Sequence, residues 1–129
     1  MNIEDFRNYC LAIKGTTEST PFLDPDVVAF KVMDKMFAML SLTPKDGIFK
    51  ADMKCDPEYT LELRDKYEGI GPGHVPSTLL WHRIILDSDV PDKLIGELIE
   101  HAVAEVIKKL PKKKQTEYYK EESELNIPE

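Results

Sequence analysis

The chain has no long hydrophobic run, and its other scarcities narrow the class of protein. Its apolar stretches extend over only a few residues, so no segment is long enough to cross a bilayer as a helix. Two cysteines in 129 residues cannot build a disulfide framework and favour a reduced environment. The N-terminus, MNIEDFRNYC, carries acidic residues where a secretory signal is basic and then apolar. We therefore expect a cytoplasmic protein without a membrane partner.

Motifs for catalysis and metal binding are also missing. The sequence contains no CxxC, HExxH or GxSxG pattern, which argues against structural zinc, zincin proteases and α/β-hydrolases. Glu97, His101 and Glu105 recur at helical spacing, but this spacing is more typical of a solvated face with Glu–His pairs than of a metal site. We expect no catalytic residue, no metal, no cofactor and no enzymatic activity.

The two cysteines give no nucleophile either. Cys10 lies on the apolar side of the first expected helix, where it is typical of a small core residue. Cys55 precedes an expected helix N-terminus, a position that can lower the pKa of a thiol. An exposed, unreactive thiol is the more common arrangement there, and this is what we expect of Cys55.

Positive charge is in deficit. The chain has 17 basic and 24 acidic side chains and a formal net charge of −7. Residues 1–110 and residues 111–129 each have a negative net charge, so the excess of acidic side chains is not confined to one tail. Because affinity for nucleic acid comes mainly from neutralising phosphates, this balance argues against strong non-specific binding, although a local basic face remains compatible with it.

The hydrophobic period changes along the chain. Helical spacing of apolar residues is expected over three segments, 3–13, 56–67 and 88–110, and a period of two over four segments, 27–33, 36–42, 48–54 and 78–87. The first two strands form a hairpin around Asp34-Lys35, and residues 69–78 form an exposed loop. The order α–β–β–β–α–β–α predicts an α+β fold with an antiparallel sheet and helices packed on one face. We expect one domain over 1–110 and a charged C-terminal tail, frayed or partly helical, over 111–129.

Basic side chains form two candidate groups for nucleic-acid contact. The first comes from the expected strands and consists of Lys31, Lys35, Lys50, Lys54 and Arg83. The second is the run KKLPKKK at 108–114, which includes Lys112, Lys113 and Lys114. If the strand residues converge, they can contact phosphates, with Trp81 as a stacking surface. Against this, Asp52 shares their face, Trp81 is typical of a core residue, and the lysine run fits a helix C-terminus followed by a solubilising tail.

Several segments resemble the MmcQ/YjbR family over roughly residues 1–114. They are ESTPF at 18–22, VVAFKVMDKMFAMLSL at 27–42, MKCDPEYTLELRDKY at 53–67, Trp81 with its apolar strand, and VPDKLIGELIEHA with KKLPKK at 90–113. The resemblance implies a CyaY-like, double-wing fold and a bacterial cytosolic protein that binds DNA. Lys35, Lys54, Arg64 and Trp81 match positions of the family's motifs.

The chain departs from the family pattern in the loop before the last strand. Relatives carry a polar run there, whereas His74 stands in place of a tyrosine and the following positions are Val75, Ser77, Thr78 and Leu80. His74 and Trp81 are therefore the loop and ligand candidates. The resemblance favours a non-enzymatic module that binds double-stranded DNA weakly through its strand and C-terminal lysines. The alternative is a protein-interaction or regulatory domain with no nucleic-acid partner.

Overall fold

The structure, a computed structural model, describes residues 1–20, 23–73 and 79–125. Its elements are α1 (Ile3–Ala12), β1 (Thr17–Ser19), β2 (Val27–Val32), β3 (Lys35–Ser41), β4 (Lys50–Lys54), α2 (Pro57–Lys66), β5 (Ile70–Pro72), β6 (Trp81–Ile85), α3 (Asp92–Lys108) and α4 (Lys112–Leu125). Six strands form one antiparallel sheet in the order β1-β2-β3-β4-β6-β5. The predicted α+β fold is therefore confirmed. Two short edge strands, β1 and β5, were not predicted, and β5 lies within the loop expected at 69–78.

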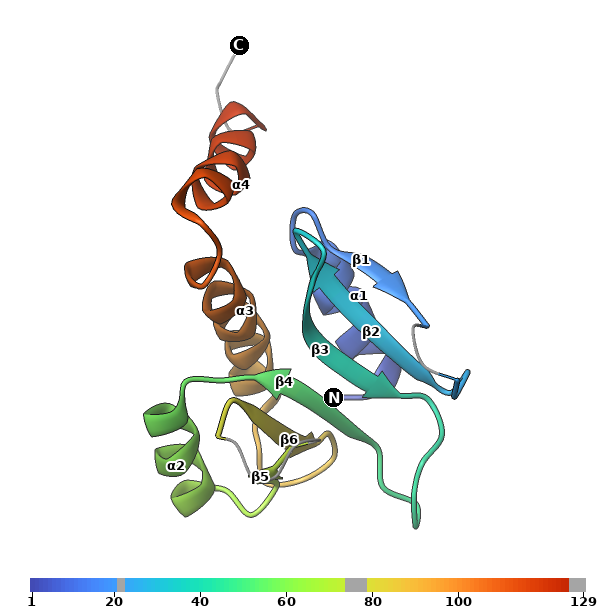
Figure 1. The fold of residues 1–129 in the computed structure, drawn as a ribbon. Helices are drawn as coiled ribbons and strands as arrows, with labels where there is room; N and C mark the ends of the chain where they lie inside the picture. Colours follow the sequence, from blue (N-terminus) through green and yellow to red (C-terminus); the bar gives the residue numbers. More distant parts are fainter. Residues whose placement is uncertain (21–22, 74–78, 126–129) are drawn as a thin grey trace.

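The sheet consists of two three-stranded halves joined by a short seam. β3 and β4 pair only over Ala38–Met53, Met39–Asp52 and Leu40–Ala51. Beyond this seam the β2–β3 hairpin rises away from β4 and β6, with β1 on its outer edge (Figure 1). The two halves of the sheet, β1-β2-β3 and β4-β6-β5, therefore extend in different directions.

The β2–β3 turn lies one residue earlier than predicted. Met33 and Asp34 occupy the two turn positions, both in the left-handed region with φ of 49° and 63°. Val32 pairs with Lys35, so the latter already belongs to β3. Two consecutive left-handed residues make a type I′ turn, whose twist matches that of the flanking strands. The expectation of Asp34-Lys35 at the turn was wrong because no glycine marks the position.

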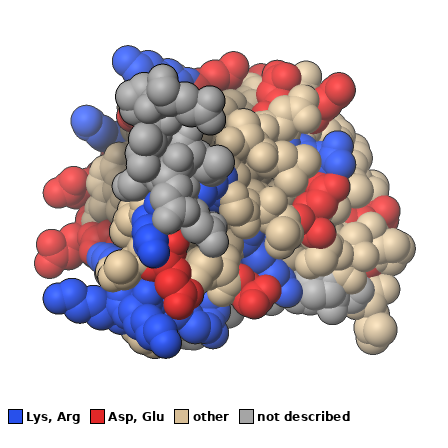
Figure 2. Space-filling view, turned by 90° about the horizontal axis from the view of Figure 1, so that it is seen from above, with Lys and Arg blue, Asp and Glu red and all other residues tan. Residues whose placement is uncertain are grey.

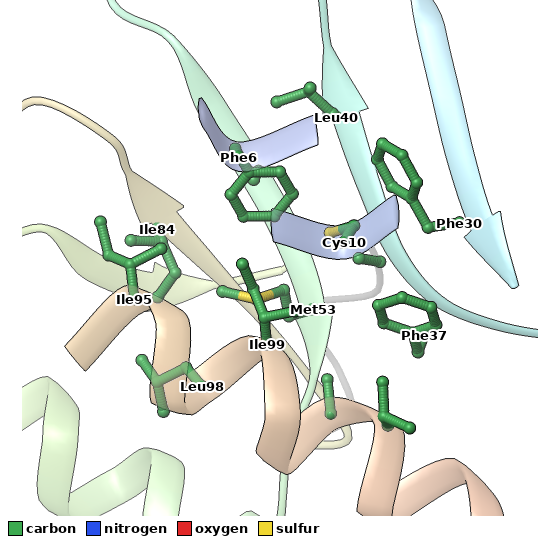
Figure 3. Close-up of a cluster of buried hydrophobic side chains, with 14 of the residues drawn as sticks. Phe6, Cys10, Phe30, Phe37, Leu40, Met53, Ile84, Ile95, Leu98 and Ile99 are labelled. Carbon is green, nitrogen blue, oxygen red and sulfur yellow. The ribbon is translucent and has the colours of Figure 1, made fainter. Parts of the chain in front are cut away.

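The core lies between one face of the sheet and the helices α1 and α3. Phe6 and Cys10 of α1 meet Phe30, Phe37 and Met53 of the strands, and α3 contributes Ile95, Leu98 and Ile99 to the same cluster (Figure 3). The ring of Phe30 lies 6.3 Å from that of Phe6 and 6.5 Å from that of Phe37. Burial of this cluster provides the main stabilisation of the fold.

Helix α1 crosses α3 at Gly96. A Cβ at this position would lie 2.8 Å from the ring of Tyr9, so a larger residue would push the two helices apart. The Tyr9 hydroxyl then donates a hydrogen bond to the Glu100 carboxylate, 3.2 Å away. The glycine inside α3, unfavourable for a helix by itself, is therefore explained by this close approach.

Helix α2 begins as its sequence predicts, whereas α3 does not. Asp56 caps α2, accepting hydrogen bonds from the backbone N–H groups of Glu58 and Tyr59. In α3 the cap position is Pro91, without a side-chain hydrogen bond. Asp89, near the start of the expected helix, instead accepts hydrogen bonds from the backbone N–H groups at 68 and 69, and so ties α2's C-terminal end to the loop before α3.

The expected tail contains a helix. α4 follows Pro111 and is held against the end of α1 by a reciprocal pair of contacts. The Tyr118 hydroxyl donates to the Lys14 carbonyl at 3.1 Å, and the Lys14 ammonium donates to the Tyr118 carbonyl at 3.3 Å. No helix within residues 1–20, 23–73 and 79–125 is long and apolar enough to span a membrane.

Candidate nucleic-acid interface

Strand register places four of the predicted cations on the sheet face opposite the core. Asp52 pairs with Arg83 and Lys54 with Trp81, while the neighbours Ala51, Met53 and Ile84 point into the core. Because side chains alternate along a strand, Lys31, Lys50, Lys54 and Arg83 share the face away from α1 and α3. Lys50 and Lys54 lie on one side of β4, as the sequence predicts, whereas Lys35 is paired with the core residue Val32. Whether they act together depends on their neighbours.

Arg83 does not offer a free positive charge. Its Nε lies 2.8 Å from Asp52 Oδ1 and its Nη2 lies 3.3 Å from Asp52 Oδ2, so the two side chains form a bidentate pair. Asp52 is buried, and this hydrogen bonding raises the pKa of Arg83. Asp52, the acidic residue on the same face, therefore neutralises the charge of Arg83.

Lys50 lies in a cavity with balanced charge. The cavity has a volume of about 590 Å³ and lies over the seam between β3 and β4. Its charged lining consists of three acids and three bases: Asp24, Asp26, Asp52, Lys45, Lys50 and Arg83. A phosphate approaching Lys50 would meet the carboxylates as well, so this part of the face has no net attraction for a polyanion.

Lys31 and Lys35 lie apart from the cations of β4 and β6. Both belong to the β2–β3 hairpin, which extends beyond the seam and away from β4 (Figure 1). Lys35 is exposed and Lys31 is partly buried. The hairpin therefore carries its own two positive charges rather than extending the surface around Lys54.

Lys54 connects the strand lysines with those of the C-terminal helices. Its ammonium lies 4.9 Å from the centroid of the Trp81 ring, a cation–π contact. Burial, and secondly the positive charge of nearby Lys109, lower the pKa of Lys54. Trp81 is only partly buried, so the expectation that it packs in the core was wrong. Its ring instead supports Lys54 on the outer face.

We call the lysines at this place the junction patch. It consists of Lys54 and the exposed lysines at the α3–α4 junction, Lys109, Lys112, Lys113 and Lys114. In the view from above, several Lys and Arg side chains gather along one margin of the molecule, with acidic side chains close by (Figure 2). Lys108 is not included because it pairs with Glu105. Lys109 belongs to the run at 108–114 that the sequence offered as a candidate.

The Glu97, His101 and Glu105 row is not a solvated face. Glu105 is buried and pairs with Lys108, and His101 Nε2 accepts a hydrogen bond from the backbone N–H of Asp56 at 3.1 Å. Burial lowers the pKa of His101, which favours the neutral ring that this hydrogen bond requires. Within the described ranges, no group of three or more His, Cys, Asp or Glu side chains is placed to hold a metal ion.

Cys55 is neither exposed nor activated. It is 2% exposed, and burial raises the pKa of its thiol to about 12, with Asp56 and Glu105 adding to the shift. Cys55 precedes α2 as expected, but the expectation of an exposed thiol was wrong because its side chain is buried. Cys10 is a buried core residue, as predicted. Candidate His74, with positions 75, 77 and 78, lies outside the described residues.

The chain is similar to a known protein family and to solved structures. A family model described as YjbR matches residues 11–103. A crystal structure of a Deinococcus radiodurans protein with a DUF419 domain is 32% identical, with a TM-score of 0.80, and the match covers 91% of this chain and 87% of that one. No curated protein matches this chain.

A Pseudomonas syringae protein is similar in both of its structures. The crystal structure is 27% identical with a TM-score of 0.69, covering 81% of this chain and 97% of that one. The solution structure, also 27% identical, has a TM-score of 0.66 and covers 79% and 90%.

Proposed function

The chain belongs to the YjbR family, and from that membership and the junction patch we propose that it is a non-enzymatic module that binds double-stranded DNA weakly through phosphates. The observation that supports the proposal is the approach of Lys54 to Lys109 from two different elements. Neither lysine forms an ion pair with any described residue. Two cations held close together repel each other, and a phosphate between them relieves this repulsion.

The proposed affinity is limited by the rest of the surface. The junction patch offers five lysines, whereas the whole chain carries a net charge of −7. Each phosphate neutralised on duplex DNA contributes about 0.9 to the slope of log affinity against log salt. A slope no steeper than about −4.5 and a Kd within the non-specific range of about 10⁻⁴ to 10⁻⁶ M follow from a patch of this size.

A salt-dependent anisotropy titration with a fluorescent duplex tests this proposal. The double variant Lys109→Gln/Lys113→Gln removes two charges from the patch and is expected to reduce the slope by about 2. The matched control Lys31→Gln/Lys35→Gln removes two charges from the hairpin and is expected to leave the slope unchanged. Equal effects of the two variants would contradict the assignment to the patch.

Protein interaction is the second candidate function, and the cavity over the seam favours it. Besides its balanced charges, this cavity is lined by the apolar residues Val27, Met39 and Ile48. Ile48 is 39% exposed and offers apolar surface to a partner at this cavity. Absence of DNA binding at 50 mM salt would remove the first proposal and leave a protein partner at this cavity as the function to test.

A further inference from the structure

Three buried nitrogen atoms beneath α2 have no hydrogen-bond partner. Within the part of the chain that the structure describes, these are Arg64 Nε, Arg64 Nη2 and His82 Nε2. His82 is fully buried, and Arg64 is partly buried with two of its guanidinium nitrogen atoms enclosed. Leaving charged donors buried and unpaired is strongly unfavourable, so such groups are normally satisfied by a partner.

The two side chains come from facing elements. Thr60 and Arg64 are four residues apart on α2 and therefore lie on the same side of the helix. Thr60 Oγ1 lies 3.1 Å from His82 Nδ1, which fixes α2 over this part of β6. Burial and the nearby charges of Arg64 and His101 lower the pKa of His82 to about 4. Arg64 is thus close enough to His82 to repel its charged form.

We propose that Arg64 and His82 form a binding site for one oxyanion group, a phosphate or a carboxylate. A guanidinium is a planar donor that matches such groups, and its positive charge beside a neutral histidine favours an anion over a neutral acceptor. Arg64 forms no ion pair with a described carboxylate: Glu105 pairs with Lys108, and Asp56 caps α2. The site is therefore short of negative charge.

The oxyanion selects one tautomer of His82. When the Thr60 hydroxyl donates to Nδ1, the proton of the ring lies on Nε2, and the site then presents N–H donors from both side chains. In the other tautomer Nε2 is an acceptor and would face the anion with a lone pair. The bound state is therefore expected to hold His82 as the Nε2–H tautomer.

This site is distinct from the junction patch. Alternation along β6 places His82 on the helix-covered face and Trp81, with Lys54, on the opposite face. Anion binding beneath α2 and DNA binding at the patch are consequently independent, and each proposal can fail without the other.

The first test measures the melting temperature of the full chain against sodium phosphate and, separately, sodium acetate, at constant ionic strength with chloride. A melting temperature that rises and saturates supports the site, and the anion that acts at lower concentration identifies the group. Arg64→Gln is expected to raise the apparent Kd at least about tenfold. Lys66→Gln removes the same charge from the exposed side of α2 and is expected to preserve the effect, as is Lys109→Gln/Lys113→Gln at the patch.

The second test follows the His82 ring by ¹⁵N NMR in the unmodified chain, which needs no variant to fold. Phosphate or acetate is expected to slow exchange of the Nε2 proton and shift its resonance in a saturable manner. A response that is absent, or equal in Arg64→Gln, would show that water alone satisfies these atoms and would overturn the proposal.

Discussion

Neighbouring residues on β6 show how the face of the sheet decides the chemistry of a side chain. Arg83 points outward and is neutralised by Asp52, whereas His82 points inward and is fully buried. The alternation that separates them is readable from the sequence. Their partners are not, because Asp52 and Thr60 are 31 and 22 residues away and meet them only through the register of β4 with β6 and the docking of α2.

His82 makes the stability of the fold depend on pH. Its pKa is about 4 in the folded chain against 6.5 for an ordinary histidine. The unfolded chain therefore binds a proton more readily than the folded one, and stability present above pH 6.5 is lost as the pH falls toward 4. Urea unfolding is expected to show a loss of about 2–3 kcal/mol from this residue between pH 7 and 4.5.

The variant His82→Asn isolates this contribution, because it removes the titrating ring and keeps a polar atom for Thr60. The difference in unfolding free energy between pH 7 and 4.5 is expected to be smaller in the variant by that amount. An unchanged difference would assign the acid sensitivity to other groups, such as His101, whose pKa is also lowered, or the carboxylates.

At the scale of elements, the long periodic segments were predictable and the short ones were not. Periods of two and 3.6 located β2, β3, β4 and β6 and the helices α1, α2 and α3. The edge strands β1 and β5 are three residues each, too short for a period to be visible, and exist because β2 and β6 offer them pairing partners. Likewise, nothing in residues 111–129 indicates that Tyr118 packs on α1.

The turn between β3 and β4 provides a test of local backbone conformation. Asp46 and Gly47 connect the bridged pair Lys45–Ile48 with φ of 56° and 77°. A Cβ at Gly47 would meet no atom within 4 Å, so substitution affects only the backbone. Gly47→Ala is expected to lower the unfolding free energy by about 1 kcal/mol, measured by urea denaturation.

Gly71 supplies the matched control. A Cβ there also meets nothing within 4 Å, but its φ lies outside the left-handed region. Gly71→Ala is expected to change the unfolding free energy by less than about 0.5 kcal/mol. Similar losses at both positions would mean that the left-handed conformation is not the cause.

At the scale of the whole molecule, the two halves of the sheet divide the charges that the sequence placed on one face. Lys31, Lys50, Lys54 and Arg83 share an orientation, but orientation alone does not make a surface. Lys31 and Lys35 lie on the hairpin, away from β4 and β6. Lys50 and Arg83 lie beside carboxylates at the seam. Among these strand residues, Lys54 is the one that lies near the junction lysines. The alternation in a sequence predicts on which face of the sheet a residue lies. It does not predict the direction in which each half of the sheet extends.

The attachment of α4 determines whether the junction lysines are held in place. Tyr118 is 7% exposed, belongs to the core cluster, and donates a hydrogen bond to the Lys14 carbonyl. Tyr118→Ala removes this anchor, so amide exchange in α4 is expected to accelerate at least about tenfold while α3 and the sheet stay protected. Tyr119→Ala, at a neighbouring position that is 49% exposed, is the control and is expected to leave α4 protected. If α4 exchanges equally in both variants, Tyr118 is not what fixes the helix. If instead protection is lost throughout the chain, α4 is an integral part of the domain, because its removal then unfolds the core that α1 and α3 share.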